Sequence, residues 1–158
     1  MKVISGGQTG VDRAALDAAL ELGLDVGGWC PRGRRAEDGR IPDRYPLHET
    51  SSSAYPARTA ANVREADATL ILTRGPATSR GTALTRRLAA AHGKPLREVD
   101  LTAGPRPEAV REWLDQLAVK TLNVAGPRLS EAADIYAHAR AFLLAVLRPD
   151  SGLARGQR

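Results

Sequence analysis

The sequence predicts an α/β protein of the Rossmann type, a three-layer sandwich in which a mostly parallel five-stranded sheet carries helices on both faces. Three observations support this prediction. Short apolar runs alternate with longer segments whose apolar residues recur every three or four positions. The run at 68–73, ATLILT, is uninterrupted, as expected for a strand buried in a parallel sheet. Glycine-rich turns follow three of the runs, where parallel strands would pass into helical crossovers.

The expected elements follow one another along 1–148, which we interpret as one domain, with a flexible basic tail at 149–158. Strands are expected at 2–5, 25–29, 68–73, 95–99 and 121–125. Helices are expected at 11–22, 57–66, 81–91, 110–117 and 135–146, the last of them capped by Ser130. The proline-broken stretch 30–53 is long for a connection inside a compact domain, so we expect a functional or a disordered loop there.

The formal net charge is +5, and the arginines alternate with Asp and Glu rather than forming a lysine-rich run. A basic balance favours polyanionic partners, but this interleaving argues against nucleic acid, and a GC-rich genome explains the arginines equally well. The three histidines and the single cysteine match no zinc spacing, so no protein-ligated metal is expected. No apolar run reaches the roughly 18 residues of a membrane span. Because no leader segment is evident, we expect a cytoplasmic protein.

The first glycine-rich turn joins the first strand to the first helix and is the strongest candidate for phosphate binding. Amides at a helix N-terminus carry partial positive charge and attract phosphate, and glycine permits the positive φ angles that expose them. The expected phosphate ligands are Gly6, Gly7, Gln8, Thr9, Gly10 and Arg13, with the Thr9 hydroxyl also capping the helix. Neither the dinucleotide nor the P-loop fingerprint fits. The alternative is a tight turn in which glycine serves packing alone.

Further candidate ligands follow the other strands or lie in the 30–53 stretch and the helix after it. Arginine can bind phosphate through two parallel hydrogen bonds, and glycine at a strand end allows a close approach of the backbone. These candidates are Arg32, Gly33, Arg34, Arg58, Thr59, Asn62, Gly81, Thr82, Gly126 and Arg128. Asn62 is disfavoured within a helix, which indicates a specific hydrogen bond. For the arginines of the 30–53 stretch, a solvated loop of mixed charge is the alternative.

Catalytic groups are harder to assign than ligand contacts. Asp12, Glu37 and Asp38 could act as acid or base only if folding brings them to the bound ligand. Pairing with neighbouring arginines is the commoner outcome for such carboxylates. Cys30 lies near Arg32, which could lower the pKa of the thiol, but a buried and inert thiol is the commoner case.

The chain contains four segments that together resemble one family. They read SGGQTGVDRAALDAAL, GGWCPRGRRAEDGRIPDRYPLHET, RTAANVREADATLIL and GTALT, and they are similar to the molybdenum carrier family, the circularly permuted YpsA branch of the SLOG group of Rossmann-like folds. The resemblance covers roughly 1–146. It implies that Gly126-Pro127-Arg128 is the opening turn of the unpermuted fold, and that the Gly6–Gly10 turn is its phosphate motif moved to the front. The first and fifth strands would then be neighbours, and both turns would meet at one crevice.

The resemblance also implies a carrier of molybdenum cofactor, a pterin with a phosphate tail, or of a nucleotide. Relatives in the phosphoribohydrolase branch cleave nucleoside monophosphates with a glutamate after Gly-Gly-x-Gly-Thr. Here Arg13 stands at the glutamate position and Asp12 one residue earlier, a rotation of about 100° on a helix. We therefore expect a binding protein for a phosphorylated nucleotide-like or pterin-like small molecule, with a nucleotide hydrolase or a nucleic-acid-binding protein as alternatives. Related folds further imply a homo-oligomer, either a dimer or a tetramer.

Overall fold

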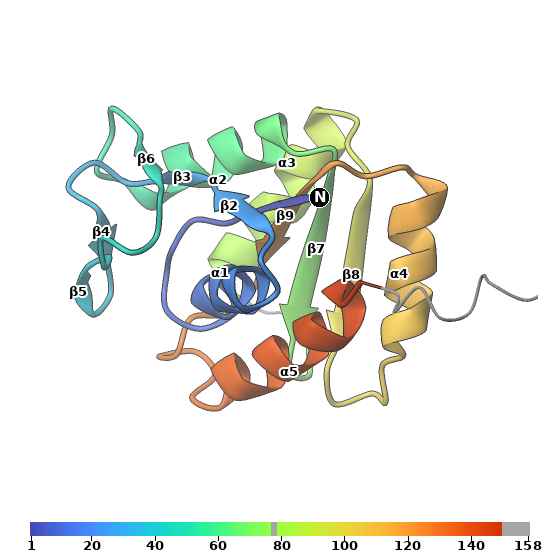
Figure 1. Ribbon diagram of the computed structural model, residues 1–158. Coiled ribbons are helices and arrows are strands. Elements are labelled where there is room, and N and C mark those ends of the chain that lie inside the picture. Colours follow the sequence, from blue (N-terminus) through green and yellow to red (C-terminus); the bar gives the residue numbers. More distant parts are fainter. Residues whose placement is uncertain (77–78, 150–158) are drawn as a thin grey trace, which may run out of the picture.

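The central sheet of the computed structural model has five strands, all parallel, in the order β2-β1-β9-β7-β8 (Figure 1). The structure describes residues 1–76 and 79–149, so the expected tail lies outside the described residues apart from its first residue. The strands are β1 (Lys2–Ile4), β2 (Asp25–Gly27), β7 (Ala68–Thr73), β8 (Leu96–Asp100) and β9 (Thr121–Ala125). The predicted parallel sheet is confirmed, and β7, which is buried along its whole length, keeps its predicted bounds.

The helices of the described ranges form the two outer layers. They are α1 (Val11–Glu21), α2 (Tyr55–Glu65), α3 (Arg80–Ala91), α4 (Pro107–Gln116) and α5 (Ile135–Leu147). Figure 1 shows α2 and α3 packed together on one side of the sheet and α1 and α5 on the other, and α4 packs against α5. Fully buried alanines bring α1 close to its neighbours. None of these helices combines the length and the apolar character needed to cross a membrane.

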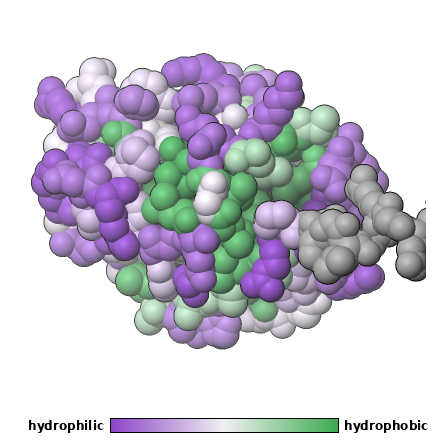
Figure 2. All heavy atoms as spheres, in the orientation of Figure 1, coloured by the Kyte–Doolittle hydropathy of each residue, from purple (hydrophilic) through white to green (hydrophobic). Residues whose placement is uncertain are grey.

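One face of the molecule carries a patch of apolar side chains (Figure 2). In Figure 2 hydrophobic side chains gather over α1 and β2, and hydrophilic side chains surround them. Leu22, Leu24 and Val26 of this region are only partly buried and pack against the main core. The larger part of the apolar side chains lies between the sheet and the two helix layers, as the predicted sandwich requires.

The two strands at opposite ends of the chain are neighbours in the sheet. Lys2 pairs with Thr121 in parallel register. The turns that follow these strands also touch, because Val11 N donates to Pro127 O at 3.2 Å. The neighbouring strands and the shared crevice that the resemblance implies are therefore confirmed.

The segment 28–53, which we call the arm, is more ordered than the sequence predicts. Gly28 ends the expected strand early, because its φ is +123° and a Cβ there would lie 2.2 Å from the Ser5 carbonyl oxygen. Beyond it, β3 (Trp29–Cys30) pairs with β6 (His48–Glu49), and β4 (Arg35–Ala36) pairs with β5 (Gly39–Arg40). A small apolar cluster holds the arm to α1, and it comprises Leu16, Cys30, Ala36, Ile41, Tyr45 and Leu47. The expectation of a disordered loop over 30–53 is therefore wrong, and its alternative, a functional loop, stays a prediction.

Candidate functional site

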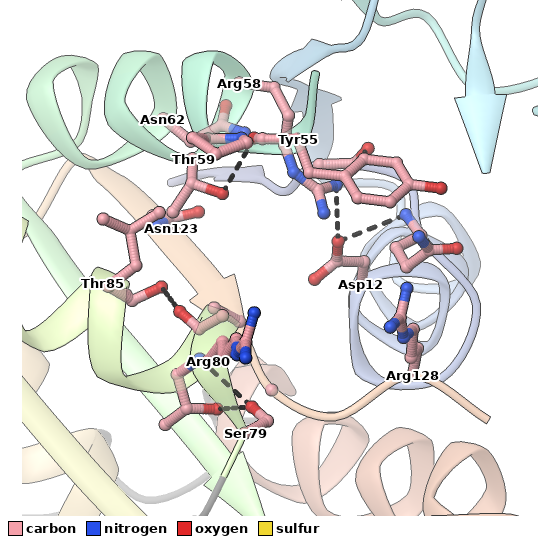
Figure 3. Close-up of a pocket in the computed structure, with 18 of the residues that line it drawn as sticks. Asp12, Tyr55, Arg58, Thr59, Asn62, Ser79, Arg80, Thr85, Asn123 and Arg128 are labelled. Atoms are coloured by element: carbon pink, nitrogen blue, oxygen red, sulfur yellow. Dashed lines mark hydrogen bonds and ion pairs between the residues drawn. The ribbon is translucent and has the colours of Figure 1, made fainter. Parts of the chain in front are cut away.

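A pocket of about 440 Å³ opens at the carboxyl edge of the sheet, beside α2 and α3 (Figure 3). The end of β9, from Asn123 to Gly126, forms one wall, and the β1–α1 turn, α2 and the start of α3 form the others. Ligands of open parallel sheets bind beyond the carboxyl ends of the strands, where the direction of winding reverses. Here the chain passes from β1 to β2 toward one edge of the sheet and from β7 to β8 toward the other edge. The winding therefore reverses around β9, and the pocket lies at this reversal.

Three arginines from three segments line this pocket. Arg58 comes from α2, Arg80 from the first turn of α3 and Arg128 from the loop after β9, and Figure 3 shows them around the same cavity. Two carboxyl side chains, Asp12 and Glu131, lie in the same lining. Because the arginines outnumber the carboxyl groups, the lining favours an anionic ligand.

Asp12 and Arg58 form a buried ion pair in the wall of the pocket (Figure 3). Arg58 Nη1 lies 3.4 Å from Asp12 Oδ2 and donates to Gly6 O at 3.1 Å. A Cβ on Gly6 would lie 2.2 Å from Arg58 Nη1, so this glycine makes room for the guanidinium. Burial raises the pKa of Asp12, although the charge of Arg58 and the hydrogen bond from the Gln8 amide oppose the shift.

Three amides of the β1–α1 turn, those of Gly7, Gln8 and Thr9, already have acceptors, so the expectation of unpaired amides is wrong for these three residues. Gln8 N donates to Asp12 Oδ2 at 3.1 Å, and Thr9 N donates to Gln8 Oε1 at 3.1 Å. Gly7 N lies 3.4 Å from its acceptor, Ser5 Oγ. The oxygens come from the turn itself and from the start of α1, so an anion bound to these amides would have to displace them.

Glu37 joins the arm to both glycine-rich turns, and we call its contacts with Thr9, Arg128 and Ser130 the Glu37 junction. The carboxylate accepts hydrogen bonds from Thr9 Oγ1, from Ser130 N at 3.1 Å and from Ser130 Oγ at 2.5 Å. Arg128 Nε lies 3.6 Å from Glu37 Oε2. The helix caps predicted for Thr9 and Ser130 are therefore wrong, because both hydroxyls bind Glu37 and both helices begin without a side-chain cap.

The Glu37 junction makes stability depend on pH. Desolvation opposes ionisation of Glu37, but hydrogen bonds from Ser130 and Thr9 outweigh it and hold the pKa of the carboxyl below its ordinary value. The stabilisation of the fold by the Glu37 carboxylate is therefore complete above the pKa of a glutamate in the unfolded chain, about 4.3. It is lost as the pH falls through the lower pKa of Glu37 in the folded protein. We expect the difference in unfolding free energy between the wild type and Glu37→Gln to shrink from pH 6 to pH 3.5 in urea titrations. A difference that stays constant over this range would contradict the assignment.

Nine residues predicted at the site lie outside the pocket lining, namely Gly7, Thr9, Gly10, Arg13, Arg32, Gly33, Arg34, Glu37 and Asp38. Arg34 is 9% exposed and donates to backbone carbonyls of the arm. Arg13 Nη1 binds Asp38 Oδ2 at 2.5 Å, and this hydrogen bond holds the pKa of Asp38 below its ordinary value. Arg32 and Gly33 are exposed on the arm. The pairing of a candidate carboxylate with a neighbouring arginine is thus confirmed for Asp38.

Other predicted residues do meet in the pocket. The lining contains Gly6, Gln8, Arg58, Thr59, Asn62, Gly81, Thr82, Gly126 and Arg128 and the catalytic candidate Asp12. Asn62 makes the specific hydrogen bonds that its place in a helix indicated, since it accepts from Trp29 N at 2.8 Å and donates to Trp29 O at 3.0 Å. The lining also contains residues that were not predicted, among them Tyr55, Arg80, Thr85 and Asn123. Two of these residues could have been predicted from the sequence, because Arg80 adjoins a predicted turn and Asn123 is a polar residue inside a buried strand.

Among the residues that the structure describes, the pocket lining contains neither Cys30 nor a histidine. Cys30 is buried, and burial raises the pKa of its thiol, as expected for an inert side chain. Within 1–76 and 79–149, the structure contains no group of three or more His, Cys, Asp or Glu side chains that could hold a metal ion. The groups available to a ligand are therefore guanidinium, carboxyl, amide and hydroxyl groups.

Comparisons with known proteins agree with this architecture. The model of the Circularly permutated YpsA SLOG family matches residues 3–147. A crystal structure from Syntrophus aciditrophicus, described as a "putative molybdenum carrier protein", is 41% identical, with a TM-score of 0.87 over 92% of this chain and 94% of that one. The search of curated proteins finds no match. The family match spans nearly the whole chain, and the chain therefore belongs to the circularly permuted YpsA SLOG family.

Proposed function

We propose that this protein binds and carries a phosphorylated small molecule, either a nucleotide or a pterin such as the molybdenum cofactor. The observation that best supports the proposal is that Arg58, Arg80 and Arg128 line one pocket at the carboxyl edge of the sheet. A volume of about 440 Å³ suits a small molecule. The planar guanidinium groups match the oxygens of a phosphate, and the name of the similar crystal structure supports molybdenum cofactor as one such cargo.

The pocket suits the phosphate better than the amides of the Gly6–Gly10 turn do. A phosphate on those amides would displace the Asp12 carboxylate from Gln8 N and bring a second negative charge next to it. A phosphate in the pocket would instead meet guanidinium groups on several sides. Of the turn, only Gly6 and Gln8 lie in the lining, and these two residues would contact the ligand directly.

Arg80→Ala tests this function. Native mass spectrometry of protein purified without added ligand identifies any retained compound, and calorimetry with nucleoside monophosphates and isolated molybdenum cofactor measures affinity. Loss of a charged hydrogen bond weakens binding by about 1.5–3 kcal/mol, so we expect a roughly 10- to 100-fold weaker affinity. Arg87→Ala is the matched control, because Arg87 is exposed on the same helix and outside the pocket lining. Equal affinities of the two variants would refute the assignment.

A nucleotide hydrolase is the second candidate, and Asp12 is the observation in its favour. Its carboxyl group lies in the pocket wall, has a raised pKa and contacts Arg58, as an acid–base residue beside a bound phosphate would. The same nucleotide panel tests this function if each mixture is also analysed for free base. If the wild type releases free base and Asp12→Asn does not, hydrolysis is established. If the nucleotides are unchanged after prolonged incubation, hydrolysis is excluded for that panel.

A further inference from the structure

The pocket has two sides of different chemistry. Figure 3 shows Thr59, Asn123 and Thr85 on one side of the cavity. These residues come from α2, β9 and α3, and we call them the neutral wall, because their side chains carry only amide and hydroxyl groups. The opposite side of the cavity carries the ionisable side chains of Asp12 and Arg128. The neutral wall therefore suits a different part of a ligand from the part that carries the charge.

Asn123 of the neutral wall is buried, yet half of its amide group has no partner in the protein. Leu122 and Val124 point into the main core, so the alternation along β9 turns Asn123 to the opposite face of the sheet. Its side chain is 3% exposed, and Nδ2 donates to Thr69 Oγ1 on the neighbouring strand β7 at 3.3 Å. Among the described residues this is its only side-chain hydrogen bond, which leaves the acceptor Oδ1 to a ligand.

The two hydroxyl groups of the neutral wall also offer acceptors. Thr59 Oγ1 donates to Tyr55 O at 3.2 Å, and Thr85 Oγ1 donates to Gly81 O at 2.9 Å, in each case one turn earlier in the same helix. These bonds use the hydroxyl hydrogens, and each oxygen keeps lone pairs that can accept from an N–H group. The neutral wall thus presents oxygen acceptors from three elements. It matches a neutral group with several N–H donors and not a phosphate, whose oxygens accept.

We infer that the neutral wall is a subsite for a heterocycle whose edge carries a ring N–H group beside an exocyclic amino group, as in guanine and in pterins. This inference rests on the proposed function and adds to it the class of ring that the carrier selects. Such an edge brings its N–H donors side by side, and the oxygens of Thr59, Thr85 and Asn123 accept them. Adenine carries an unprotonated ring nitrogen beside its amino group, and this nitrogen would meet an acceptor without a hydrogen between them.

Calorimetry with GMP, IMP and AMP tests the subsite, because GMP and IMP differ only in the exocyclic amino group. A site built to bind an N–H group discriminates strongly against an analogue that lacks it. We therefore expect the wild type to bind GMP at least tenfold more tightly than IMP or AMP. The double variant Thr85→Val/Asn123→Leu removes two acceptors at nearly constant volume. It should bind GMP at least tenfold more weakly than the wild type does, and should bind GMP and IMP within twofold of each other.

Two controls accompany the double variant. Thr121→Val makes the same kind of replacement at the other end of β9, outside the pocket lining, and should leave the affinities and the preference for GMP unchanged. Arg80→Ala should weaken GMP and IMP by the same factor, because the two nucleotides carry the same phosphate. Circular dichroism and melting temperature verify that each variant is folded. If the double variant does not fold, the preference of the wild type among the three nucleotides decides.

The outcomes separate this subsite from the function on which it rests. Nucleotide binding that Arg80→Ala weakens, but that shows no preference for GMP in the wild type, overturns the subsite and keeps the proposed function. A preference for GMP that persists in the double variant also overturns the assignment to the neutral wall. If molybdenum cofactor alone binds, an unchanged affinity of the double variant for it overturns the subsite, and a tenfold loss supports it. A wild type that binds neither the nucleotides nor molybdenum cofactor overturns both proposals.

Discussion

Gly10→Ala is expected to lower the free energy of unfolding by about 3 kcal/mol, which corresponds to a fall of roughly 10 °C in melting temperature for a chain of this size. Gly10 has a φ of +81°, and a Cβ there would lie 2.3 Å from Pro127 O and 3.0 Å from Arg128 Cα. Both contacts are to backbone atoms, which cannot move aside as a flexible side chain can. The substitution would force apart the turns that follow β1 and β9. Differential scanning calorimetry measures the effect.

Gly23→Ala is the matched control for this variant. Gly23 has a φ of +72°, close to that of Gly10, but a Cβ there would meet nothing within 4 Å. It therefore retains the cost of the left-handed backbone, about 1 kcal/mol, without the steric contact. We expect its melting temperature to fall by only about 2–4 °C. Similar falls in both variants would show that the close contact between the two turns adds nothing.

Arg34→Ala is expected to cost about 3–5 kcal/mol, although the sequence suggested this residue as a phosphate ligand. The side chain is buried, and it donates to four backbone carbonyls, which are Ile41 O at 3.1 Å, Pro42 O at 2.7 Å, Tyr45 O at 2.8 Å and Leu47 O at 3.4 Å. Its removal takes a charged donor from all four carbonyls, although Pro42 O keeps a donor in Tyr45 N and Tyr45 O keeps one in Leu47 N. Hydrogen exchange should show lost protection over 31–49, in addition to a lower melting temperature.

Two further variants separate the shape of the Arg34 side chain from its charge. Arg34→Lys keeps the charge, but an ammonium group lacks the planar set of N–H donors with which the guanidinium reaches several carbonyls. We therefore expect Arg34→Lys to be little more stable than Arg34→Ala. Arg32→Ala removes an exposed arginine two residues away and should change the unfolding free energy by less than about 0.5 kcal/mol. A large loss in Arg32→Ala, or full recovery in Arg34→Lys, would contradict this role of Arg34.

The fold could be predicted where periodicity and burial agree. β7 is buried along its whole length, and its residues other than Thr69 and Thr73 are apolar, so its pattern had a single interpretation. The arm could not be predicted in the same way, because strands of two residues carry no measurable period. The break at Gly28 depends on the carbonyl of Ser5, which is distant in sequence and becomes a neighbour only after β1 and β2 have paired.

The candidate site was predictable in position but not in its bonding. Turns at strand ends indicated Gly81, Gly126 and Arg128, which line the pocket, because parallel strands end at a common edge. Arg58 was indicated by its place in the helix after the 30–53 stretch. The chain alone could not distinguish Arg34, which binds carbonyls, from Arg80, which lines the pocket, since both are arginines next to glycine-containing turns. That distinction depends on contacts formed only in the folded protein.

The middle place of β9 in the sheet has a consequence for how the protein is made. Of the strands in residues 1–76 and 79–149, β9 is the last to leave the ribosome, yet it pairs with β1 on one side and β7 on the other. A nascent chain that stops before Thr121 can form the β2-β1 and β7-β8 pairs but has no strand to bridge them. The cavity that β9 walls therefore comes into being only after β9 has been synthesised, and a chain that stops before Thr121 cannot capture a ligand there.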